Sequence, residues 1–408
     1  MAEQFFPETE AQLLDFVNWA LAEKKTLDIQ GRGGKSGFGF ESRADCGLSL
    51  QRFSGILEYE PTELVMKARA GTPLAEIHQA LAANRQQLAF EPPQLSRLYS
   101  DKDQPGTIGG VFMGNLSGPR RFTAGAARDH ILGINAINGR GESYKAGGKV
   151  IKNVTGYDVS KLLAGSWGTL SLVTELTFKV LPRAQTSASL GLWGQTPDQA
   201  FQCFRLLAGS PYQISGLAFV PERVVPKLNL DKELGHRNNL TVVRLEGPAS
   251  SVKERIQHIK AMLGSGGLQV MYEEEASSAV WQALRDVAAF WDDRQTPAVM
   301  KLSIPPAAML DLIRVIEQIS GCDWYADAGG AWIWVGICHG MPEDRINTLR
   351  REIASITGSA VLYRASESVK RNTGIFSGRS AALTTLTRRI KQGFDPGNIF
   401  NPGRLYLY

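Results

Sequence analysis

A glycine-rich segment, Gly31–Gly39, is the first part of the sequence that could carry chemistry. It reads GRGGKSGFG and follows a predicted strand at Thr26–Gln30. Glycines tolerate positive φ and leave room for close approach, so consecutive backbone N–H groups can converge on an anion such as a pyrophosphate. A P-loop would need glycine at Ile29 and a dinucleotide fingerprint would need glycine at Ser36, so the spacing excludes both. By itself the segment is as consistent with a surface turn as with an anion site.

A second block of small residues extends over Thr107–Asp129. It contains the runs TIGG and GNLSG. The side chains of Thr107, Asn115 and Ser117 offer hydrogen bonds, and a backbone this rich in glycine can wrap tightly around a ligand. A closely packed loop within a domain would have the same composition, so both interpretations stay open.

A third block, Gly165–Leu170, stands at the start of a predicted strand at Thr169–Val180. The run TLSLVTELTFKV predicts the strand because its apolar and polar residues alternate. Backbone groups exposed just before the strand could contact the edge of a planar heterocycle, and a plain hairpin turn is the alternative. Arg121 and Lys152 are near these blocks and could either neutralise a phosphate or lie on a solvated surface.

The composition and the spacing of histidines and cysteines exclude several classes of site. The 408 residues are 43% hydrophobic and carry a scattered net charge of +5, which favours weak attraction for anions over nucleic-acid binding. The four cysteines form no CxxC pair and the five histidines no HxH pair, so we expect no metal or iron–sulfur cluster held by this chain. No apolar run approaches the ~18 residues of a membrane span. The N-terminus lacks a secretory signal, which predicts a cytoplasmic protein.

Helix and strand signals fill the sequence between these blocks. A capping-box pattern begins at Thr9 and predicts a first helix. Thr72 is expected to cap the next helix, and a last helix, Ala381–Lys391, to end at Gly393. From about residue 190 glycine becomes scarce and strands alternate with helices. This predicts a second domain with an antiparallel sheet and helices on one of its faces.

The order of the three blocks resembles the FAD-binding domain of the vanillyl-alcohol-oxidase family, also called the PCMH type. In that family the first loop cradles the FAD pyrophosphate, a TIGG…N.SG block wraps around the cofactor, and a strand G-T-L-x-x-V-T lies along the flavin. Here the matching segments are Gly31–Gly37, Thr107–Gly118 and Gly168–Thr174. The C-terminal NPGR, Asn401–Arg404, resembles the closing NPGK loop of the lactate- and glycolate-dehydrogenase branch.

Within that branch the chain is similar to the family of E subunits of bacterial glycolate oxidase, or glycolate dehydrogenase. The segments that carry this similarity are Tyr157–Leu162, Arg128–Gly133 and Val361–Arg364. The resemblance implies an α+β protein, with a two-lobed PCMH-type FAD-binding domain followed by an α+β cap domain with an antiparallel sheet. The implied division is residues 1–182 for the FAD domain, 183–380 for the cap, and 381–408 for a C-terminal helix and loop that return to the FAD domain.

The resemblance also implies which residues contact FAD. They are Arg32, Gly33, Gly34, Lys35, Ser36, Thr107, Gly109, Gly110, Asn115, Ser117, Gly118, Asp129, Gly168, Thr169, Leu170 and Val173. Members that hold FAD covalently use a histidine in the first loop, where this chain has Lys35, so we expect noncovalent FAD. No catalytic residue is assigned, because the chain lacks the HxH pair of the catalytic 2-hydroxy-acid dehydrogenases.

The function implied is that of the FAD-binding subunit of a glycolate dehydrogenase complex. Such a complex oxidises glycolate to glyoxylate and passes electrons to iron–sulfur centres on a partner. The expected partners are a paralogous catalytic flavoprotein subunit and an iron–sulfur subunit, with contact to the inner face of a membrane only through them. Two alternatives stay open: a self-sufficient flavin-dependent oxidase or dehydrogenase of another hydroxylated substrate, and a noncatalytic subunit that uses the fold to hold partners.

Overall fold

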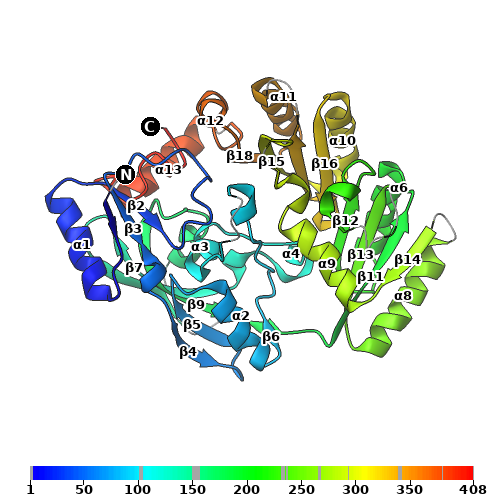
Figure 1. The fold of residues 1–408 in the computed structure, drawn as a ribbon, viewed down its shortest axis with the longest axis horizontal. Coiled ribbons are helices and arrows are strands. Elements are labelled where there is room, and N and C mark those ends of the chain that lie inside the picture. Colours follow the sequence, from blue (N-terminus) through cyan, green and yellow to red (C-terminus); the bar gives the residue numbers. More distant parts are fainter. Residues whose placement is uncertain are drawn as a thin grey trace. The chain divides into compact units, whose positions relative to one another are not determined.

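The chain forms two compact units, each made of helices and strands (Figure 1). The computed structural model describes residues 3–100, 104–148, 157–230, 235, 238–264, 268–292, 294–338, 342–378 and 380–407. Unit 1 comprises Met1–Ser117, Gly125–Arg183 and Arg379–Tyr408, and unit 2 comprises Gly118–Ala124 and Ala184–Gly378. The predicted α+β class is confirmed.

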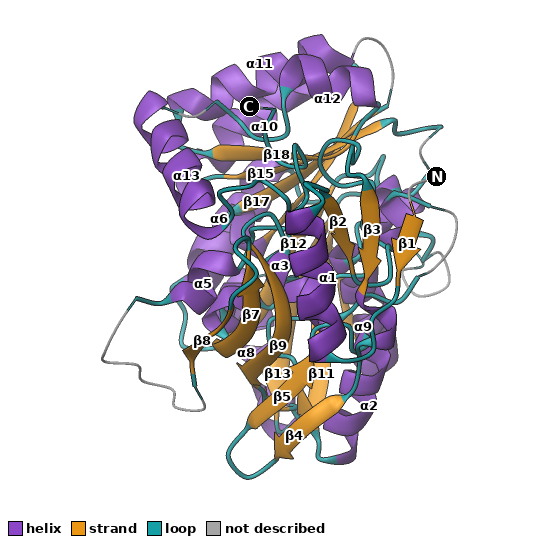
Figure 2. Ribbon diagram, turned by 90° about the vertical axis from the view of Figure 1, so that its left-hand side faces the viewer, coloured by secondary structure: helices purple, strands orange, loops and turns teal. Residues whose placement is uncertain are grey.

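Unit 1 contains two main sheets. The larger is antiparallel and its strands, seen side by side in Figure 2, follow the order β4 (Ile56–Glu60), β5 (Val65–Arg69), β9 (Ser171–Lys179), β7 (Ile131–Asn138) and β8 (Ser143–Gly147). The smaller is parallel, in the order β1 (Glu3–Phe5), β3 (Cys46–Ser49) and β2 (Leu27–Gln30), and a further pair joins β6 (Gln86–Gln87) to β10 (Leu181–Pro182). The predicted strand at Thr169–Val180 is confirmed as β9, which is mostly buried because β5 and β7 flank it.

The helices of unit 1 begin with the one predicted from the capping box. They are α1 (Glu10–Ala22), α2 (Leu74–Ala83), α3 (Ile108–Met113), α5 (Val159–Leu163) and α13 (Ala381–Phe394). At the start of α1 the Thr9 hydroxyl accepts from Gln12 N–H at 3.2 Å, and the Gln12 side chain accepts from Thr9 N–H at the same distance. The predicted capping box is therefore confirmed.

Two predicted helix ends are wrong. Pro73, not Thr72, is the N-cap of α2, because the Thr72 hydroxyl is engaged elsewhere: it donates to Arg69 O at 2.7 Å. The last helix, α13, does not end at Gly393 but continues to Phe394. A glycine inside a helix costs only about 1 kcal/mol relative to alanine, which the rest of a long helix can absorb.

Unit 2 is built on one eight-stranded sheet whose described strand pairs are all antiparallel, so the predicted antiparallel cap sheet is confirmed. The strand order is β14 (Leu268–Tyr272), β11 (Thr186–Trp193), β13 (Leu240–Gly247), β12 (Ile214–Val220), β16 (Cys322–Asp327), β17 (Trp332–Ile337), β15 (Ala298–Ser303) and β18 (Ser359–Arg364). Its helices are α4 (Arg121–Ala124), α6 (Pro197–Ala208), α8 (Ala249–Leu263), α9 (Glu274–Arg285), α10 (Met309–Gln318), α11 (Pro342–Ser355) and α12 (Glu367–Thr373).

The core of unit 2 lies between one face of this sheet and the helices α6, α8, α10 and α11. Leu190 of β11, Phe204 of α6 and Trp324 of β16 belong to this core. The prediction that helices cover a single face is incomplete, because α9 packs on the opposite one. There the Trp281 indole of α9 donates to Ser189 Oγ of β11 at 2.8 Å.

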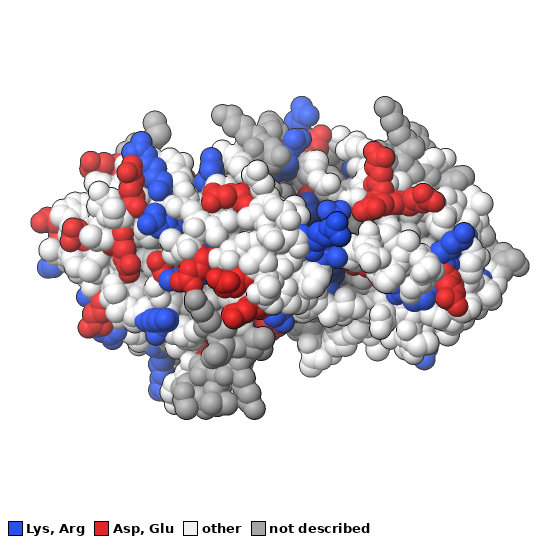
Figure 3. Space-filling model, turned by 90° about the horizontal axis from the view of Figure 1, so that it is seen from below, with Lys and Arg blue, Asp and Glu red and all other residues white. Residues whose placement is uncertain are grey.

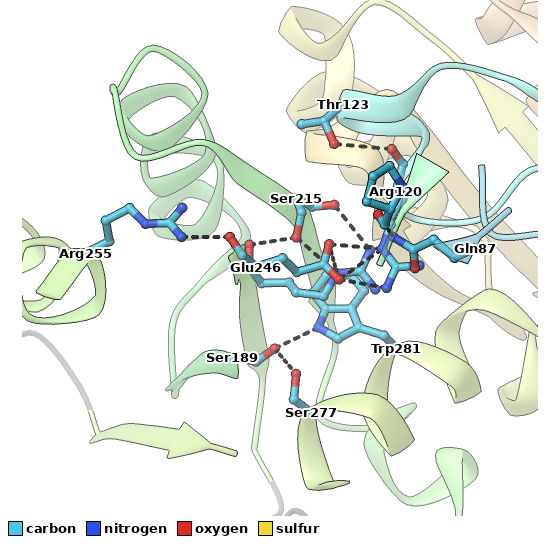
Figure 4. Close-up of polar contacts among 11 residues, drawn as sticks. Gln87, Arg120, Thr123, Ser189, Ser215, Glu246, Arg255, Ser277 and Trp281 are labelled. Carbon is cyan, nitrogen blue, oxygen red and sulfur yellow. Dashed lines mark hydrogen bonds and ion pairs between the residues drawn. The ribbon is translucent and has the colours of Figure 1, made fainter. Parts of the chain in front are cut away.

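A buried ion-pair network holds the segment Gly118–Ala124 on the face of the sheet that α9 covers (Figure 4). Glu246 accepts hydrogen bonds from Nε and Nη2 of Arg120, the shortest at 2.7 Å. Arg244, only 2% exposed, lies 3.9 Å from the same carboxylate. The Arg244 guanidinium is 4.5 Å from the Trp281 ring centroid and donates to Ser215 Oγ at 3.3 Å. The Glu246 carboxylate is thus the counter-charge of two largely buried guanidinium groups, those of Arg120 and Arg244.

We expect Glu246→Ala to lower the free energy of unfolding of unit 2 by about 3 kcal/mol, because it leaves buried positive charges without their carboxylate. Burial alone would raise the pKa of Glu246, but the hydrogen bonds from Arg120 and the charge of Arg244 outweigh burial and lower it. The stabilisation is then present above the ordinary value of 4.5 and is lost as the pH falls through the lowered pKa.

Thermal melting at pH 7 and at pH 3 checks this prediction. Glu254→Ala, which removes an exposed carboxylate from α8, is the matched control. Two results would contradict a stabilising role of the Glu246 carboxylate. One is a melting temperature of Glu246→Ala at pH 7 equal to that of Glu254→Ala. The other is a loss of melting temperature in Glu246→Ala that is as large at pH 3 as at pH 7.

Candidate functional site

A groove in unit 1 brings together parts of all three glycine-rich blocks. It contains ≈ 760 Å³ of empty space, including the part open to solvent. The first block contributes Gly31–Ser36 directly after β2, the second contributes Thr107, Gly109 and Gly110 around the start of α3, and the third contributes Trp167 and Gly168 just before β9. The strands β2 and β9 are those that the sequence predicted beside the first and third blocks, whereas the helix α3 within the second block was not predicted.

Most of the residues predicted to contact a cofactor line this groove. These are Arg32, Gly33, Gly34, Lys35, Ser36, Thr107, Gly109, Gly110, Gly168 and Val173. Thr169 and Leu170 line a second cavity of unit 1, which has Arg404 in common with the groove. Asn115, Ser117, Gly118 and Asp129 belong to neither lining.

The polar residues of the second block bind backbone in this structure. Asn115 Oδ1 accepts from Arg128 N–H at 3.0 Å, and Ser117 Oγ accepts from Ala127 N–H at 2.9 Å. Asp129 caps its own short turn by accepting from the N–H of residue 126 at 2.9 Å. These side chains shape the loop after α3, and their predicted contact with a cofactor stays a prediction.

Close packing explains why the groove needs glycine. A Cβ on Gly109 would lie 2.6 Å from Ala70 O, a backbone atom that cannot move away. Gly33 has φ +77°, in the left-handed region that side chains rarely adopt. At Thr107, the N-cap of α3, the hydroxyl accepts from Gly110 N–H at 3.1 Å and keeps the second block against the groove.

Lys35 and Arg404 are the cations of the groove that are not exposed; Arg32, which also lines it, is exposed. Burial, and then the charge of Arg404, lower the pKa of Lys35 to about 8. Arg404 donates to Lys35 O at 3.0 Å and lies 3.5 Å from Asp28 Oδ1, while its Nε is buried without a hydrogen-bond partner. Within the described part of the chain Lys35 has no ion-pair partner. Among the residues that the structure describes, the groove therefore contains a positive charge without a counter-charge, on Lys35, and a buried N–H group without an acceptor, on Arg404 Nε.

Some residues of the groove carry little signal in the sequence. The sequence points to Arg404 only as part of the NPGR loop. Trp167, which stacks on Phe38 with ring centroids 3.8 Å apart, gives no signal beyond its place in the third block. Arg121, for which a phosphate contact and a solvated surface both stayed open, does not line the groove. Its guanidinium lies 5.0 Å from the Trp332 ring centroid in unit 2. Lys152 lies outside the described residues.

Comparison with known proteins identifies the family. The FAD binding domain family matches residues 3–147, and the family of C-terminal domains of FAD linked oxidases matches residues 181–325 and 377–405. The chain is 34% identical over 97% of its length to glycolate oxidase subunit GlcE of Escherichia coli K12, of which it covers 96%. The chain belongs to the FAD-linked oxidase family.

More distant relatives agree with this membership. Glycolate oxidase subunit GlcD of Bacillus subtilis is 23% identical, over 88% of this chain and 79% of that protein. The solved structure of p-cresol methylhydroxylase superposes with a TM-score of 0.71 at 14% identity, covering 98% of this chain and 88% of that one, and so shows a shared fold. The comparisons confirm the predicted PCMH-type fold with its cap. They also confirm FAD as the cofactor.

The groove fits FAD by its own chemistry. The diphosphate of FAD would supply the negative charge that Lys35 and Arg404 lack and an acceptor for the orphaned Arg404 Nε. The glycines leave backbone N–H groups unobstructed, where side chains would block an approach.

The described residues were also compared with the requirements of a membrane span and of a metal site. Among the described residues, none of the helices is long and apolar enough to cross a membrane, and no group of three or more His, Cys, Asp or Glu is placed to hold a metal ion. On the face drawn in Figure 3, Lys and Arg are interspersed with Asp and Glu, in keeping with the scattered charge of the sequence.

We expect Lys35→Gln to weaken FAD binding roughly ten- to a hundredfold at pH 7, because it removes a charge-assisted contact to the diphosphate. In the wild type, affinity should also fall as the pH rises above about 8, where free Lys35 is neutral and must take up a proton on binding. Titration of apoprotein with FAD between pH 7 and 9, followed by flavin fluorescence, measures both effects.

The Lys35→Gln variant should lose this pH dependence, and Lys35→Arg should retain affinity without it. Lys145→Gln, which changes an exposed lysine on β8, is the control. An identical pH dependence in wild type and Lys35→Gln would remove Lys35 from the diphosphate site.

The double variant Gly33→Val, Gly34→Val should lose FAD on gel filtration. Valine at position 33 is strained at φ +77°, and a Cβ at position 34 would lie 3.1 Å from Gln104 O, so the loop must move. The exposed Gly393 of α13 provides the control Gly393→Val. Full flavin occupancy in a folded double variant, judged by absorbance at 450 nm and circular dichroism, contradicts the role of the loop.

Proposed function

We propose that this chain is the FAD-binding subunit of a glycolate dehydrogenase, or glycolate oxidase, complex that oxidises glycolate to glyoxylate. The observation that carries the proposal is the similarity to glycolate oxidase subunit GlcE, which runs through both units at 34% identity. FAD, when bound, would supply hydride-accepting redox chemistry to the complex. The share of this chain is to bind the cofactor, orient it and keep water from it.

In this proposal unit 1 is the FAD-binding domain and unit 2 is the cap. Lys35 and Arg404 neutralise the diphosphate, and the backbone of residues 31–36 and 107–110 surrounds it. The remaining predicted contacts, including Thr169 and Asn115, would lie along the cofactor. Among the described residues that line the groove there is no histidine, cysteine or tyrosine, which supports noncovalent attachment.

The cysteines support a partner chain that carries the iron–sulfur centres. Cys46, Cys203, Cys322 and Cys338 are all free and buried. Burial raises the pKa of Cys203 to about 12 and that of Cys322 to about 11, whereas a cluster needs thiolates. Electrons would therefore leave this chain for an iron–sulfur subunit, beside a paralogous catalytic flavoprotein subunit. Any contact with a membrane would be made by those partners.

Anaerobic spectroscopy tests the proposal. The purified chain, loaded with FAD, should remain yellow with glycolate, because it lacks the histidine pair of catalytic relatives. The complex purified through a tag on this chain should bleach at 450 nm and produce glyoxylate. Bleaching of the isolated chain by glycolate, D-lactate or another hydroxy acid would instead indicate a self-sufficient enzyme. Failure to take up FAD would indicate a noncatalytic interaction subunit.

A further inference from the structure

The face of the unit 2 sheet opposite its core carries a cluster of cationic and aromatic side chains. Lys301 of β15 lies between the core residues Met300 and Leu302, so its side chain points to the other face. Trp332 and Trp334 of the adjacent strand β17 share that face, because the core residues of β17 alternate with them. The Lys301 cluster comprises Lys301, Trp332, Trp334, Tyr363 of β18 and Arg121 of α4.

Two cations share one indole in this cluster. Lys301 Nζ lies 3.0 Å from the Trp332 ring centroid and 5.4 Å from that of Trp334. The Arg121 guanidinium carbon lies 5.0 Å from the Trp332 centroid. Tyr363 meets Trp334 edge-on at 5.0 Å between centroids and completes the aromatic wall. The Trp332 ring is thus already in contact with the chain's own cations, and two adjacent cations favour an anion as a further ligand here.

The Lys301 ammonium lacks hydrogen-bond acceptors. Within the described residues it has no acceptor and no ion-pair partner, although an ammonium has three donors. Burial lowers its pKa well below the ordinary value and the charge of Arg121 lowers it further, while Asp327 opposes this. Asp327 itself accepts from Ala328 N–H at 2.6 Å. An incoming carboxylate would supply the acceptor that the ammonium lacks.

A depression beside the cluster gives access to it. It measures ≈ 500 Å³, and Arg121 and Trp332 form part of its wall together with Phe122, Ser303 and Pro305. Lys301 precedes Ser303 by two residues on the same strand face, and its ammonium lies against the Trp332 ring that lines the depression. Arg121 and Trp332 line the depression and Lys301 does not, so a small organic anion there would contact Arg121 directly, and Lys301 would have to turn from the Trp332 ring to reach it.

We propose that the Lys301 cluster binds the carboxylate of a small hydroxy acid, with Lys301 and Arg121 as the cations and Trp332 as the wall. The choice of a hydroxy acid rests on the proposed function, whereas the binding of a carboxylate rests on the cluster itself. A phosphate dianion fits less well, because the indole and phenol rings present few donors for its several oxygens. Lys301 acts here as a binding residue that fixes one end of the ligand.

Equilibrium titration of the full-length, FAD-loaded chain tests this proposal without turnover. Glycolate and acetate should change tryptophan fluorescence in a saturable way, because the ammonium leaves the Trp332 face when it binds the carboxylate. Ethylene glycol, a neutral analogue of glycolate, should produce no such change. Lys301→Met should weaken glycolate binding at least tenfold, as expected for loss of a charge-assisted hydrogen bond, and Lys301→Arg should restore part of it.

Controls separate binding from folding. Lys253→Met, at an exposed position on α8, should leave glycolate affinity unchanged. Lys301→Met should melt no lower than the wild type, because it replaces a partly buried amine that has no acceptor among the described residues by an apolar chain of similar length. Unchanged glycolate affinity in a folded Lys301→Met variant overturns the proposal, as does binding of ethylene glycol that matches glycolate. Inorganic phosphate binding more tightly than acetate overturns the carboxylate assignment.

The outcomes also distinguish this inference from the proposed function. If the isolated complex fails to oxidise glycolate while the chain binds acetate through Lys301, the proposed function fails and the carboxylate site stands. If the complex oxidises glycolate and Lys301→Met changes neither KM nor the fluorescence titration, the function stands and the site fails.

Discussion

An excess of buried positive charge around a glycine backbone is the constraint on which unit 1 depends. Besides the exposed Arg32, Lys35 and Arg404 bring two cations to the groove, and Asp28, 3.5 Å from Arg404, compensates for one of them. A buried ammonium without a counter-charge is unfavourable, so the fold carries a cost until an anion enters. A bound diphosphate removes that cost, and binding that removes it also stabilises the folded state. The charge on Lys35 therefore affects two quantities at once: the affinity for the cofactor and the free energy of unfolding of unit 1.

The C-terminal loop makes that balance possible by holding Arg404 in place. Asn401 accepts from Ile29 N–H at 2.6 Å and donates to Trp167 O at 2.8 Å, so one side chain joins β2, the third glycine block and the C-terminus. Asp395 fixes the bend after α13 by accepting from two backbone N–H groups of the loop. The Asn401–Ile29 contact spans 372 positions of the chain. The groove thus forms only when both ends of the sequence are folded together.

This assembly explains which parts of the site the sequence could predict. The capping box at Thr9 is a local signal, because its structure depends on residues a few positions away. The glycines of the three blocks are visible in the composition, although the packing that requires them, such as that of Gly109 against Ala70, is long-range. Arg404 gave no such signal, since its contact with Lys35 joins positions 369 residues apart. The prediction that Thr72 caps α2 failed for a different reason. Small polar side chains can serve a helix cap, a ligand or a loop, and only the folded backbone determines which partner is nearest.

The surroundings of Lys35 and Lys301 determine which anion each can accept. The Lys35 ammonium lies against glycine backbone, so that a Cβ on Gly106 or Gly110 would be 3.3 Å from it. Bare backbone offers many N–H donors, which suits the several oxygens of a diphosphate. The Lys301 ammonium instead lies against indole rings, 3.0 Å from the nearest centroid. Aromatic rings make favourable van der Waals contacts with the carbon atoms of a ligand but provide few hydrogen-bond donors. The ligand bound most tightly there should therefore carry a single carboxylate on a small carbon skeleton. A diphosphate placed at Lys301 would leave several phosphate oxygens without hydrogen-bond donors. A small hydroxy acid placed at Lys35 would leave its carbon atoms without aromatic contacts.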